Sequence, residues 1–349
     1  MGSYGYYQPA LYLTPQYYQG TNGTDVIVGH SIVRNSISGN DGNDWLYGNI
    51  GDDWLYGDAG DDQIWAYAGD DYVRGGSGDD SIDGGDGNDL IYGDDGYDTL
   101  LGGTGDDQIS GGDGGDLILG GDWGYDRLNG DAGDDEIYFG TYGAGEAHGD
   151  SGNDKLFGGS SMDTLYGDDG DDRLSGGDGV DSLSGGAGTD VLHGDGGDDW
   201  LTIGPDVTLA YGDAGDDRII VPLEHINSKF FIDGGDGHDT LEVSYLGGLD
   251  GTLDLPLNAL SQRADSIEEL SFQYLVPKTD LHLKPGDVLD FNAGGDLQID
   301  GNAGQTLHLE GGWKDAGPAS NIGFHSYDAA VGNQVVTVHV DTAIHVEIA

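Results

Sequence analysis

Aliphatic residues recur every nine positions over most of the chain. Counted from Gly39, the pattern G-x-x-G-x-D-x-U-x, in which U is aliphatic, runs through nine copies to Leu119. After one extra residue it continues to Thr202, with a disturbance over 139–148, and a first copy stands upstream at 20–28. We call each copy a nonad and number its positions from the first glycine. A period this regular predicts a repeat architecture.

Each nonad predicts one turn and one very short strand. The triplet x-U-x alternates outward, inward, outward, as a strand does, with Ile27, Leu46 and Leu55 as the first inward residues. The six residues before it are rich in glycine, which favours a turn. One such unit cannot stand alone, but stacked units form a solenoid whose U side chains fill a thin core. The sequence therefore predicts an all-β solenoid over 20–242.

Every regular nonad carries an aspartate at position six. These twenty aspartates are Asp25, Asp44, Asp53, Asp62, Asp71, Asp80, Asp89, Asp98, Asp107, Asp116, Asp126, Asp135, Asp154, Asp163, Asp172, Asp181, Asp190, Asp199, Asp217 and Asp239. At the strand spacing of about 4.8 Å, two carboxylates repel by roughly 0.8 kcal/mol in water and by more in a partly dry site. Stacking them therefore requires a positive charge between them.

Hydrophobic burial alone does not fold such a chain. One aliphatic side chain per nonad contributes roughly 1.5–3 kcal/mol, whereas ordering nine residues of backbone costs on the order of 9–18 kcal/mol. A hard divalent cation, held by carboxylates and turn carbonyls, would remove the repulsion and join the turns. The pattern therefore predicts a chain that folds with its ions.

Composition and charge agree with this interpretation. The 349 residues include 66 Asp and Glu but only 11 Lys and Arg, which gives a formal net charge of -55. A chain with scattered acids at this density would be disordered, but these acids recur in phase. About twenty divalent ions would cancel about forty of the charges. The charge argues against a nucleic-acid partner, the absence of cysteine excludes disulfides and thiolate zinc sites, and no apolar run is long enough for a transmembrane segment.

The nonads resemble the calcium-binding repeats of the RTX family, whose motif is G-G-x-G-x-D-x-U-x. The copies that match every fixed position are GGSGDDSID (75–83), GGDGNDLIY (84–92), GGTGDDQIS (102–110) and GGDGVDSLS (176–184). The resemblance implies a calcium-bound parallel β-roll with two nonads per turn. It also implies that position-six aspartates and turn carbonyls bind Ca²⁺ between successive coils, with roughly one ion per nonad.

Some turns depart from the family pattern. Ser161 replaces the position-four glycine before Asp163, and the segments 139–148 and 203–211 supply no position-six aspartate. We therefore expect weaker sites or none there. Acids at other turn positions, such as Asp58, are expected to be solvated.

The repeat stops at Val243, and period-two alternation follows. Strand-like stretches broken by Gly, Pro, Asn and Asp predict a β-rich cap over 243–349. Two stretches, IDGNAGQTLHLEGGWKDAG and VVTVHVDTAIHV, also resemble the C-terminal regions of RTX adhesins and other proteins exported by type I secretion. This resemblance implies a C-terminal export signal and an extracellular or cell-surface location, and the first twenty residues lack the features of a signal peptide. The alternative is that these stretches form only a cap.

Aromatic residues gather at the N-terminal end. The arm over 1–19 and the outward strand positions of the first nonads carry Tyr4, Tyr6, Tyr7, Tyr12, Tyr17, Tyr18, Trp45, Tyr47, Trp54, Tyr56, Trp65 and Tyr72. Because nonads alternate between sides, Trp45, Tyr47 and Trp65 are expected on one sheet and Trp54, Tyr56 and Tyr72 on the other. Either the arm folds back over this surface, or the surface contacts another molecule.

The sequence favours a structural role. It holds neither H-E-x-x-H nor G-x-S-x-G, and we do not expect an enzyme. The preferred hypothesis is a secreted calcium-binding protein that folds outside the cell and self-assembles, as a homo-oligomer or filament, into a surface layer or biofilm matrix. The alternative is a monomeric adhesin that binds glycans or a partner protein through residues such as Trp45, Trp54, Trp65 and Trp200. Ice binding is disfavoured, because turn positions that would need Thr are mostly Asp.

Overall fold

A computed structural model of the chain describes residues 15–244, except 32, 207 and 226–228.

 The described segments beyond 244 are 253–256, 264–272, 279–284, 287, 291, 295–303, 305–320, 323–332 and 334–348. Four of the candidate contact residues, Tyr4, Tyr6, Tyr7 and Tyr12, lie outside the described residues.

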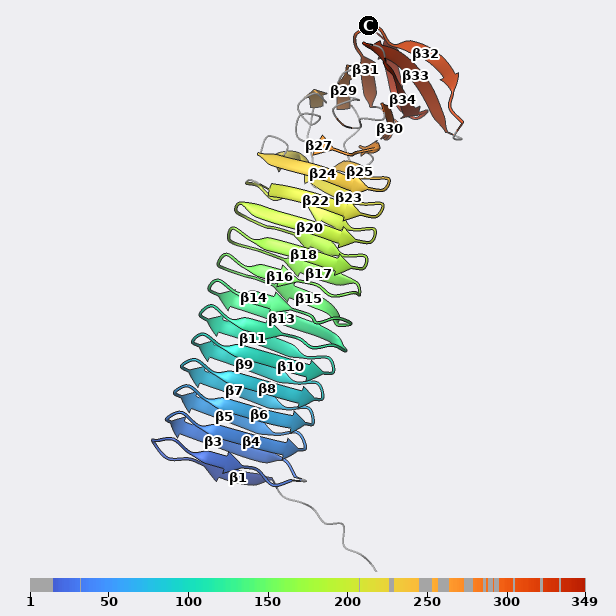
Figure 1. The fold of residues 1–349 in the computed structure, drawn as a ribbon. Helices are drawn as coiled ribbons and strands as arrows, with labels where there is room; N and C mark the ends of the chain where they lie inside the picture. The colour runs from blue at the N-terminus through green and yellow to red at the C-terminus, as the bar shows by residue number, and fades with distance from the viewer. Residues whose placement is uncertain are drawn as a thin grey trace, which may run out of the picture.

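The chain winds into a solenoid with two long sheets (Figure 1). The strands of sheet A are β1 (Gln16–Gln19), β3 (Asn35–Asp41), β5 (Trp54–Ala59), β7 (Tyr72–Ser77), β9 (Leu90–Asp95), β11 (Gln108–Asp113), β13 (Tyr125–Ala132), β15 (Ala144–His148), β17 (Asp163–Tyr166), β19 (Ser182–Ser184), β21 (Trp200–Thr202), β23 (Arg218–Pro222), β25 (Thr240–Ser244), β28 (Glu269–Ser271), β30 (Asp296–Asp300), β32 (Lys314–Pro318), β33 (Phe324–Val331) and β34 (Gln334–Asp341). The strands of sheet B are β2 (Val26–Val28), β4 (Trp45–Ile50), β6 (Gln63–Ala68), β8 (Ser81–Asp86), β10 (Thr99–Thr104), β12 (Leu117–Leu119), β14 (Glu136–Tyr138), β16 (Lys155–Phe157), β18 (Arg173–Asp178), β20 (Asp190–Gly196), β22 (Thr208–Ala214), β24 (Phe230–Asp236) and β27 (Ala264–Asp265).

Successive coils stack in parallel register, two nonads to a coil. Leu46 of β4 pairs with Ile64 of β6, and Leu55 of β5 pairs with Val73 of β7, so each partner lies eighteen residues further along the chain. The strands alternate between the two sheets, because each nonad contributes to the sheet opposite its neighbour. The predicted parallel β-roll with two nonads per turn is confirmed.

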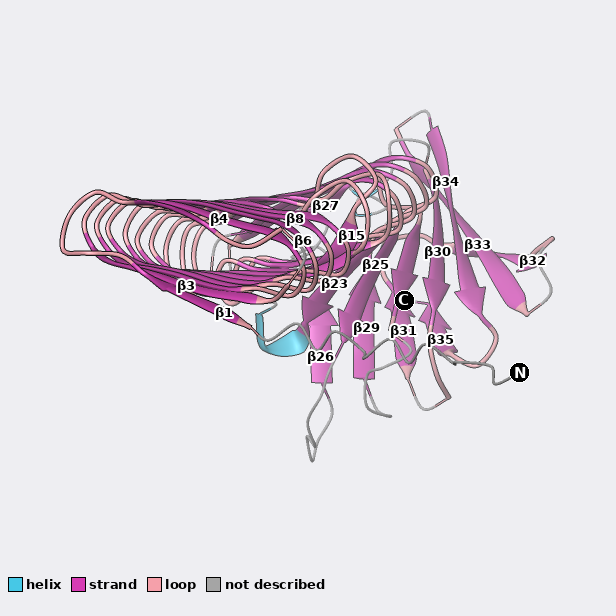
Figure 2. Ribbon diagram, turned by 90° about the horizontal axis from the view of Figure 1, so that it is seen from below, coloured by secondary structure: helices cyan, strands magenta, loops and turns pink. Residues whose placement is uncertain are grey.

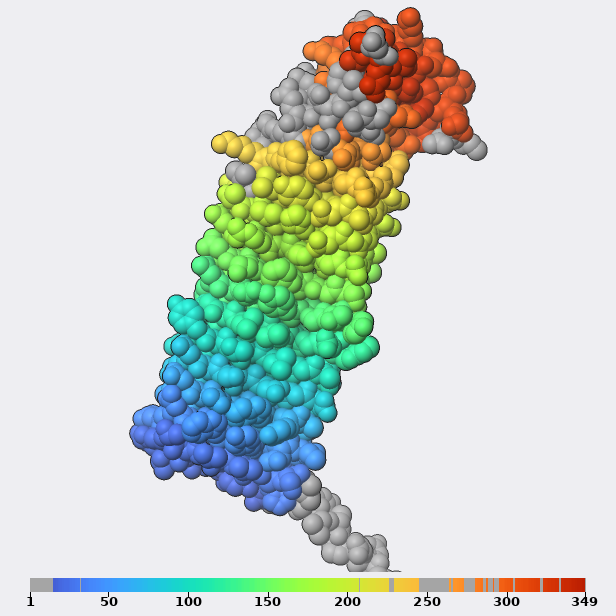
Figure 3. All heavy atoms as spheres, viewed as in Figure 1, coloured from blue at the N-terminus to red at the C-terminus, as the bar shows by residue number. Residues whose placement is uncertain are grey.

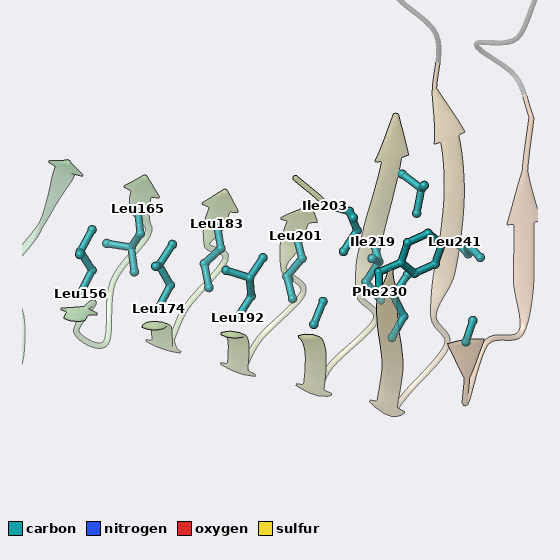
Figure 4. Close-up of a cluster of buried hydrophobic side chains, with 14 of the residues drawn as sticks. Leu156, Leu165, Leu174, Leu183, Leu192, Leu201, Ile203, Ile219, Phe230 and Leu241 are labelled. Atoms are coloured by element: carbon teal, nitrogen blue, oxygen red, sulfur yellow. The ribbon is translucent and has the colours of Figure 1, made fainter. Parts of the chain in front are cut away.

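The U side chains form the core that the pattern predicts. In most nonads the strand triplet has one buried residue between two more exposed ones, as in β4 and β5. Figure 4 shows the resulting ladder, in which leucines such as Leu156, Leu165 and Leu174 follow one another along the roll. All three are buried. The core is therefore one aliphatic side chain thick from each sheet.

Sheet A continues past the last nonad. Strand β25 pairs in parallel with β28, β28 with β30, and β30 with β34, after which β34, β33 and β32 form an antiparallel group. A third, parallel sheet consists of β26 (Leu253–Pro256), β29 (Thr279–Leu283), β31 (Thr306–Leu309) and β35 (His345–Ile348), seen side by side in Figure 2. The C-terminal region is thus β-rich, as predicted.

The molecule is elongated, with the first coils at one end and the C-terminal strands at the other (Figure 3). A 3-10 turn, η1 (Leu223–His225), follows β23. The described residues contain no helix with the length and hydropathy of a membrane span.

Candidate metal centre

The twenty position-six aspartates form two rows along the roll. Row A precedes strands of sheet A and consists of Asp53, Asp71, Asp89, Asp107, Asp126, Asp163, Asp181, Asp199, Asp217 and Asp239. Row B precedes strands of sheet B and consists of Asp25, Asp44, Asp62, Asp80, Asp98, Asp116, Asp135, Asp154, Asp172 and Asp190. Because consecutive nonads enter opposite sheets, the two rows lie on opposite edges of the roll.

Within a row, each aspartate is hydrogen-bonded to the next coil. The backbone N–H of Asp44 donates to Oδ1 of Asp62 at 2.7 Å, and that of Asp62 donates to Oδ1 of Asp80 at 2.7 Å. Nine such hydrogen bonds connect consecutive aspartates of row B. Eight connect consecutive aspartates of row A. One oxygen of each carboxylate is therefore engaged in holding the turn.

The other carboxylate oxygen, Oδ2, is unpaired in most of the rows. In eighteen of the twenty aspartates it is buried and has no hydrogen-bond partner among the residues that the structure describes. The two exceptions are Asp25, whose Oδ2 accepts the N–H of Thr21 at 2.6 Å, and Asp163, whose Oδ2 accepts the N–H of Gly159 at 2.7 Å. A buried carboxylate oxygen without a partner is costly, so its repetition points to a cation.

Position one is a glycine in every regular nonad except the one that begins at Ala66, and the missing side chain leaves space beside this oxygen. A Cβ added to Gly48 would come within 2.6 Å of Asp53 Oδ2 and 2.8 Å of the carbonyl oxygen of Ala66. At Gly176 the corresponding atoms are Asp181 Oδ2, at 2.6 Å, and the carbonyl oxygen of the next coil's first residue, at 2.8 Å. Carboxylate and carbonyl oxygens are the ligands that Ca²⁺ prefers, so these residues fit the ion.

Burial raises the pKa of the row aspartates from Asp44 onward. The pKa of Asp71 and of Asp80 rises from 3.8 to about 8, and that of Asp62 rises to about 6. Desolvation is the largest cause; the backbone hydrogen bond to Oδ1 opposes it, and neighbouring carboxylates add to it. Without a cation, burial therefore opposes the ionisation of these carboxyl groups, and most strongly that of Asp71 and Asp80.

Acids at other turn positions lie in a different environment. Asp58 and Asp61 are exposed. Asp61 Oδ1 accepts the N–H of Asp79 at 3.1 Å, and its Oδ2 accepts the side-chain amide of Asn43 at 3.1 Å. These carboxylates therefore have solvent and hydrogen-bond partners that the row Oδ2 atoms lack.

Four residues stand in the rows that the nonad pattern does not identify as ligands. Asn35 precedes Asp53 in row A, Gly145 lies between Asp126 and Asp163, and Thr208 follows Asp190 in row B. Glu268 continues row A, because its Oε2 accepts the N–H of Asp239 at 3.0 Å. The sequence pattern could not predict that Glu268 belongs to row A, because Glu268 does not lie within a nonad.

The candidate aromatic surface lies on both sheets. Trp45, Tyr47 and Trp65 belong to β4 and β6 of sheet B, whereas Trp54, Tyr56 and Tyr72 belong to β5 and β7 of sheet A. Trp45 and Trp54 are 36% and 46% exposed. Tyr47 stacks on Trp65 with ring centroids 4.9 Å apart.

The described part of the N-terminal arm belongs to the first coil. Strand β1 pairs in parallel with β3, and within it Tyr18 packs against the hydrophobic core. Tyr17 points away and is 77% exposed. Exposed aromatic rings are therefore present at this end of the roll.

Comparison with protein families gives one match. The model for the RTX calcium-binding nonapeptide repeat (4 copies) matches residues 34–64, 65–100, 98–122, 124–141, 139–174, 148–183, 166–201 and 231–243, about half of the chain. Among curated proteins, no match was found.

Proposed function

Because the chain belongs to the RTX calcium-binding nonapeptide-repeat family, we propose that it is a secreted structural protein that folds on binding calcium and assembles with copies of itself. RTX repeats bind calcium, and proteins that carry them are typically secreted. The proposed assembly is a surface layer, filament or biofilm matrix.

The unpaired Oδ2 atoms of the two rows carry this proposal. We assign the twenty row aspartates, together with main-chain carbonyls of the turns, as calcium ligands. One ion at each hydrogen-bonded step would give nine ions in row B and eight in row A. Bound calcium would neutralise the buried carboxylates and bridge successive coils.

The same chemistry makes folding depend on location. Where calcium is scarce, the stacked carboxylates repel one another and keep the chain unfolded. Extracellular calcium-binding modules commonly bind at about 10⁻⁴–10⁻³ M, so the roll would form after export. In this proposal, 1–19 is an arm whose strand β1 joins the first coil, 20–242 is the calcium-binding roll, and 243–349 is a cap that includes the export signal.

The exposed aromatic residues near the N-terminal end support self-association. Trp45, Trp54 and Tyr17 offer apolar surface on both sheets, and exposed aromatic surface is typical of protein contacts. The second candidate function is glycan binding by a monomeric adhesin. It is favoured by Trp54 and by Trp200, which is 53% exposed, because aromatic faces can stack on sugar rings.

A calcium titration of the metal-free chain tests these proposals. Circular dichroism would follow β structure while light scattering follows particle mass. A gain in both supports calcium-triggered assembly, and a gain in β structure at constant mass favours the monomeric adhesin. No gain in β structure would refute the calcium-dependent roll. A glycan screen, repeated with Trp200→Ala, tests sugar binding at a residue that the proposed self-association does not use.

A further inference from the structure

We infer that the ten-residue copy of the repeat over 29–38 closes without calcium, because the side-chain amide of Asn35 takes the place of the ion. The inference rests on the proposed function, since it concerns the same row of sites. It means that the ions of row A begin only at Asp53, although Asn35 holds the first row position.

Asn35 occupies a position in row A, but its side chain carries an amide NH₂ donor where the row aspartates carry a second carboxylate oxygen. It is fully buried, and its backbone N–H donates to Asp53 Oδ1, as that of a row aspartate does. Its side-chain Nδ2 lies 2.8 Å from the carbonyl oxygen of Gly48 and 2.9 Å from Asp53 Oδ1. The carbonyl oxygens of Val33 and His30 lie 3.0 and 3.2 Å from the same nitrogen. Four oxygens therefore converge on one nitrogen.

These oxygens are of the kind that a calcium ion would use. Three are main-chain carbonyls, and the fourth belongs to a row carboxylate. The amide NH₂ group supplies hydrogen-bond donors to them without a net charge. The orientation of the amide is fixed, because Asn35 Oδ1 accepts the N–H of His30 at 2.7 Å, and the opposite orientation would place an oxygen among four oxygens.

The two other irregular nonads fill the corresponding space with their own side chains, of which Phe139 and Ile203 are apolar and Thr208 carries a hydroxyl. In the first, Phe139 replaces the position-one glycine and is fully buried, and a Cβ added to Gly145 would lie 2.6 Å from its Cε1. In the second, Ile203 and Thr208 stand at positions one and six, and both are fully buried. Figure 4 shows Ile203 among the side chains of the core. In each irregular nonad, side-chain atoms of the nonad itself thus occupy the space that regular nonads leave open beside position one.

The irregular nonads divide the rows into blocks. Row A has one block from Asp53 to Asp126 and another from Asp163 to Asp239, and row B runs from Asp25 to Asp190. Calcium would therefore bind in three blocks, separated or ended by nonads that need no ion.

Native mass spectrometry of the full chain in calcium tests the inference. Asn35→Asp restores a carboxylate and is expected to bind one more calcium ion than the wild type. Asn43→Asp adds the same charge at an exposed turn position and is expected to leave the count unchanged. An unchanged count in Asn35→Asp, or an equal gain in both variants, would overturn the inference.

A second measurement does not depend on the variants. In calcium-loaded wild-type crystals, anomalous scattering should show an ion between Asp53 and Asp71 and none between Asn35 and Asp53. An ion beside Asn35 would overturn the inference while leaving the proposed function intact. A wild-type chain that binds no calcium would overturn the proposed function, and the inference with it.

Discussion

We expect the calcium-free chain to gain β structure when the pH falls from about 7.5 to about 5.5, because protons can replace the charge of the missing ions. The row carboxylates are buried, and their pKa values in the folded chain are raised. A group whose pKa is higher in the folded state stabilises folding below its unfolded pKa. This stability is lost as the pH rises through the folded pKa, here between about 6 and about 8.

The size of the effect follows from single residues. The pKa of Asp71 rises from 3.8 to about 8, so at pH 7 the unfolded chain has released a proton that the folded chain keeps. Over about three pH units, at about 1.4 kcal/mol each, this costs on the order of 4 kcal/mol. Asp62, raised to about 6, costs on the order of 3 kcal/mol. Since domains are stable by only about 5–15 kcal/mol, a few such residues suffice to unfold the ion-free roll.

The assay is far-UV circular dichroism in a chelator across this pH range, with light scattering to detect aggregation. Asp71→Asn removes one buried charge and should extend the folded state to higher pH, whereas Asp70→Asn, at an exposed position, should have little effect. With limiting calcium the dependence should reverse, because protons compete with the ion. If β structure in chelator is unchanged or falls on acidification, the explanation from buried carboxylates is wrong.

Three further variants test the site, the core and the contact surface. Gly48→Val would place Cβ 2.6 Å from Asp53 Oδ2 and adds two methyl groups to the single methyl that Ala66 carries at position one of its own nonad, so it should remove at least one ion from the count in native mass spectrometry; Gly23→Val, whose added Cβ meets nothing within 4 Å, should not. Leu100→Ala truncates a fully buried side chain and should lower the free energy of unfolding in calcium by about 2–5 kcal/mol, measured with denaturant; a negligible loss would contradict a continuous core. Trp54→Ala should reduce calcium-dependent self-association in sedimentation without changing the circular dichroism, and full association would argue against the aromatic contact.

The regular part of the fold could be predicted because each nonad repeats the same two constraints. An aliphatic residue at position eight must face the core, and an aspartate at position six must face the next coil. The positions of Leu46 and Asp44 within their nonad therefore predict which residues of the next coil stack on them. The rows could be listed for the same reason. The bond from each backbone N–H to the next Oδ1, and the unpaired Oδ2, depend on turn geometry that the spacing does not contain.

The row residues and coils outside the regular nonads could not be predicted, because their spacing differs from nine residues. Asn35 lies in a ten-residue copy, so counting by nine does not place it in row A. In the C-terminal region the coils become longer: Thr240 pairs with Glu269, and Glu269 pairs with Gln298. Period-two alternation predicts strands there, but it carries no information about parallel stacking on sheet A.

The two ends of the roll differ in what closes them. Near the N-terminal end, Asn35 at the start of row A satisfies the oxygens of its turn with an amide. At the other end, row A passes from Asp239 to Glu268, so a residue of the C-terminal region supplies the next carboxylate. The coils beyond it bury larger side chains, including Phe272 and Phe291, and so depend less on ions for their stability. Because ordered coils present a template for the next, calcium-dependent folding would begin at the C-terminal end and proceed toward Asn35.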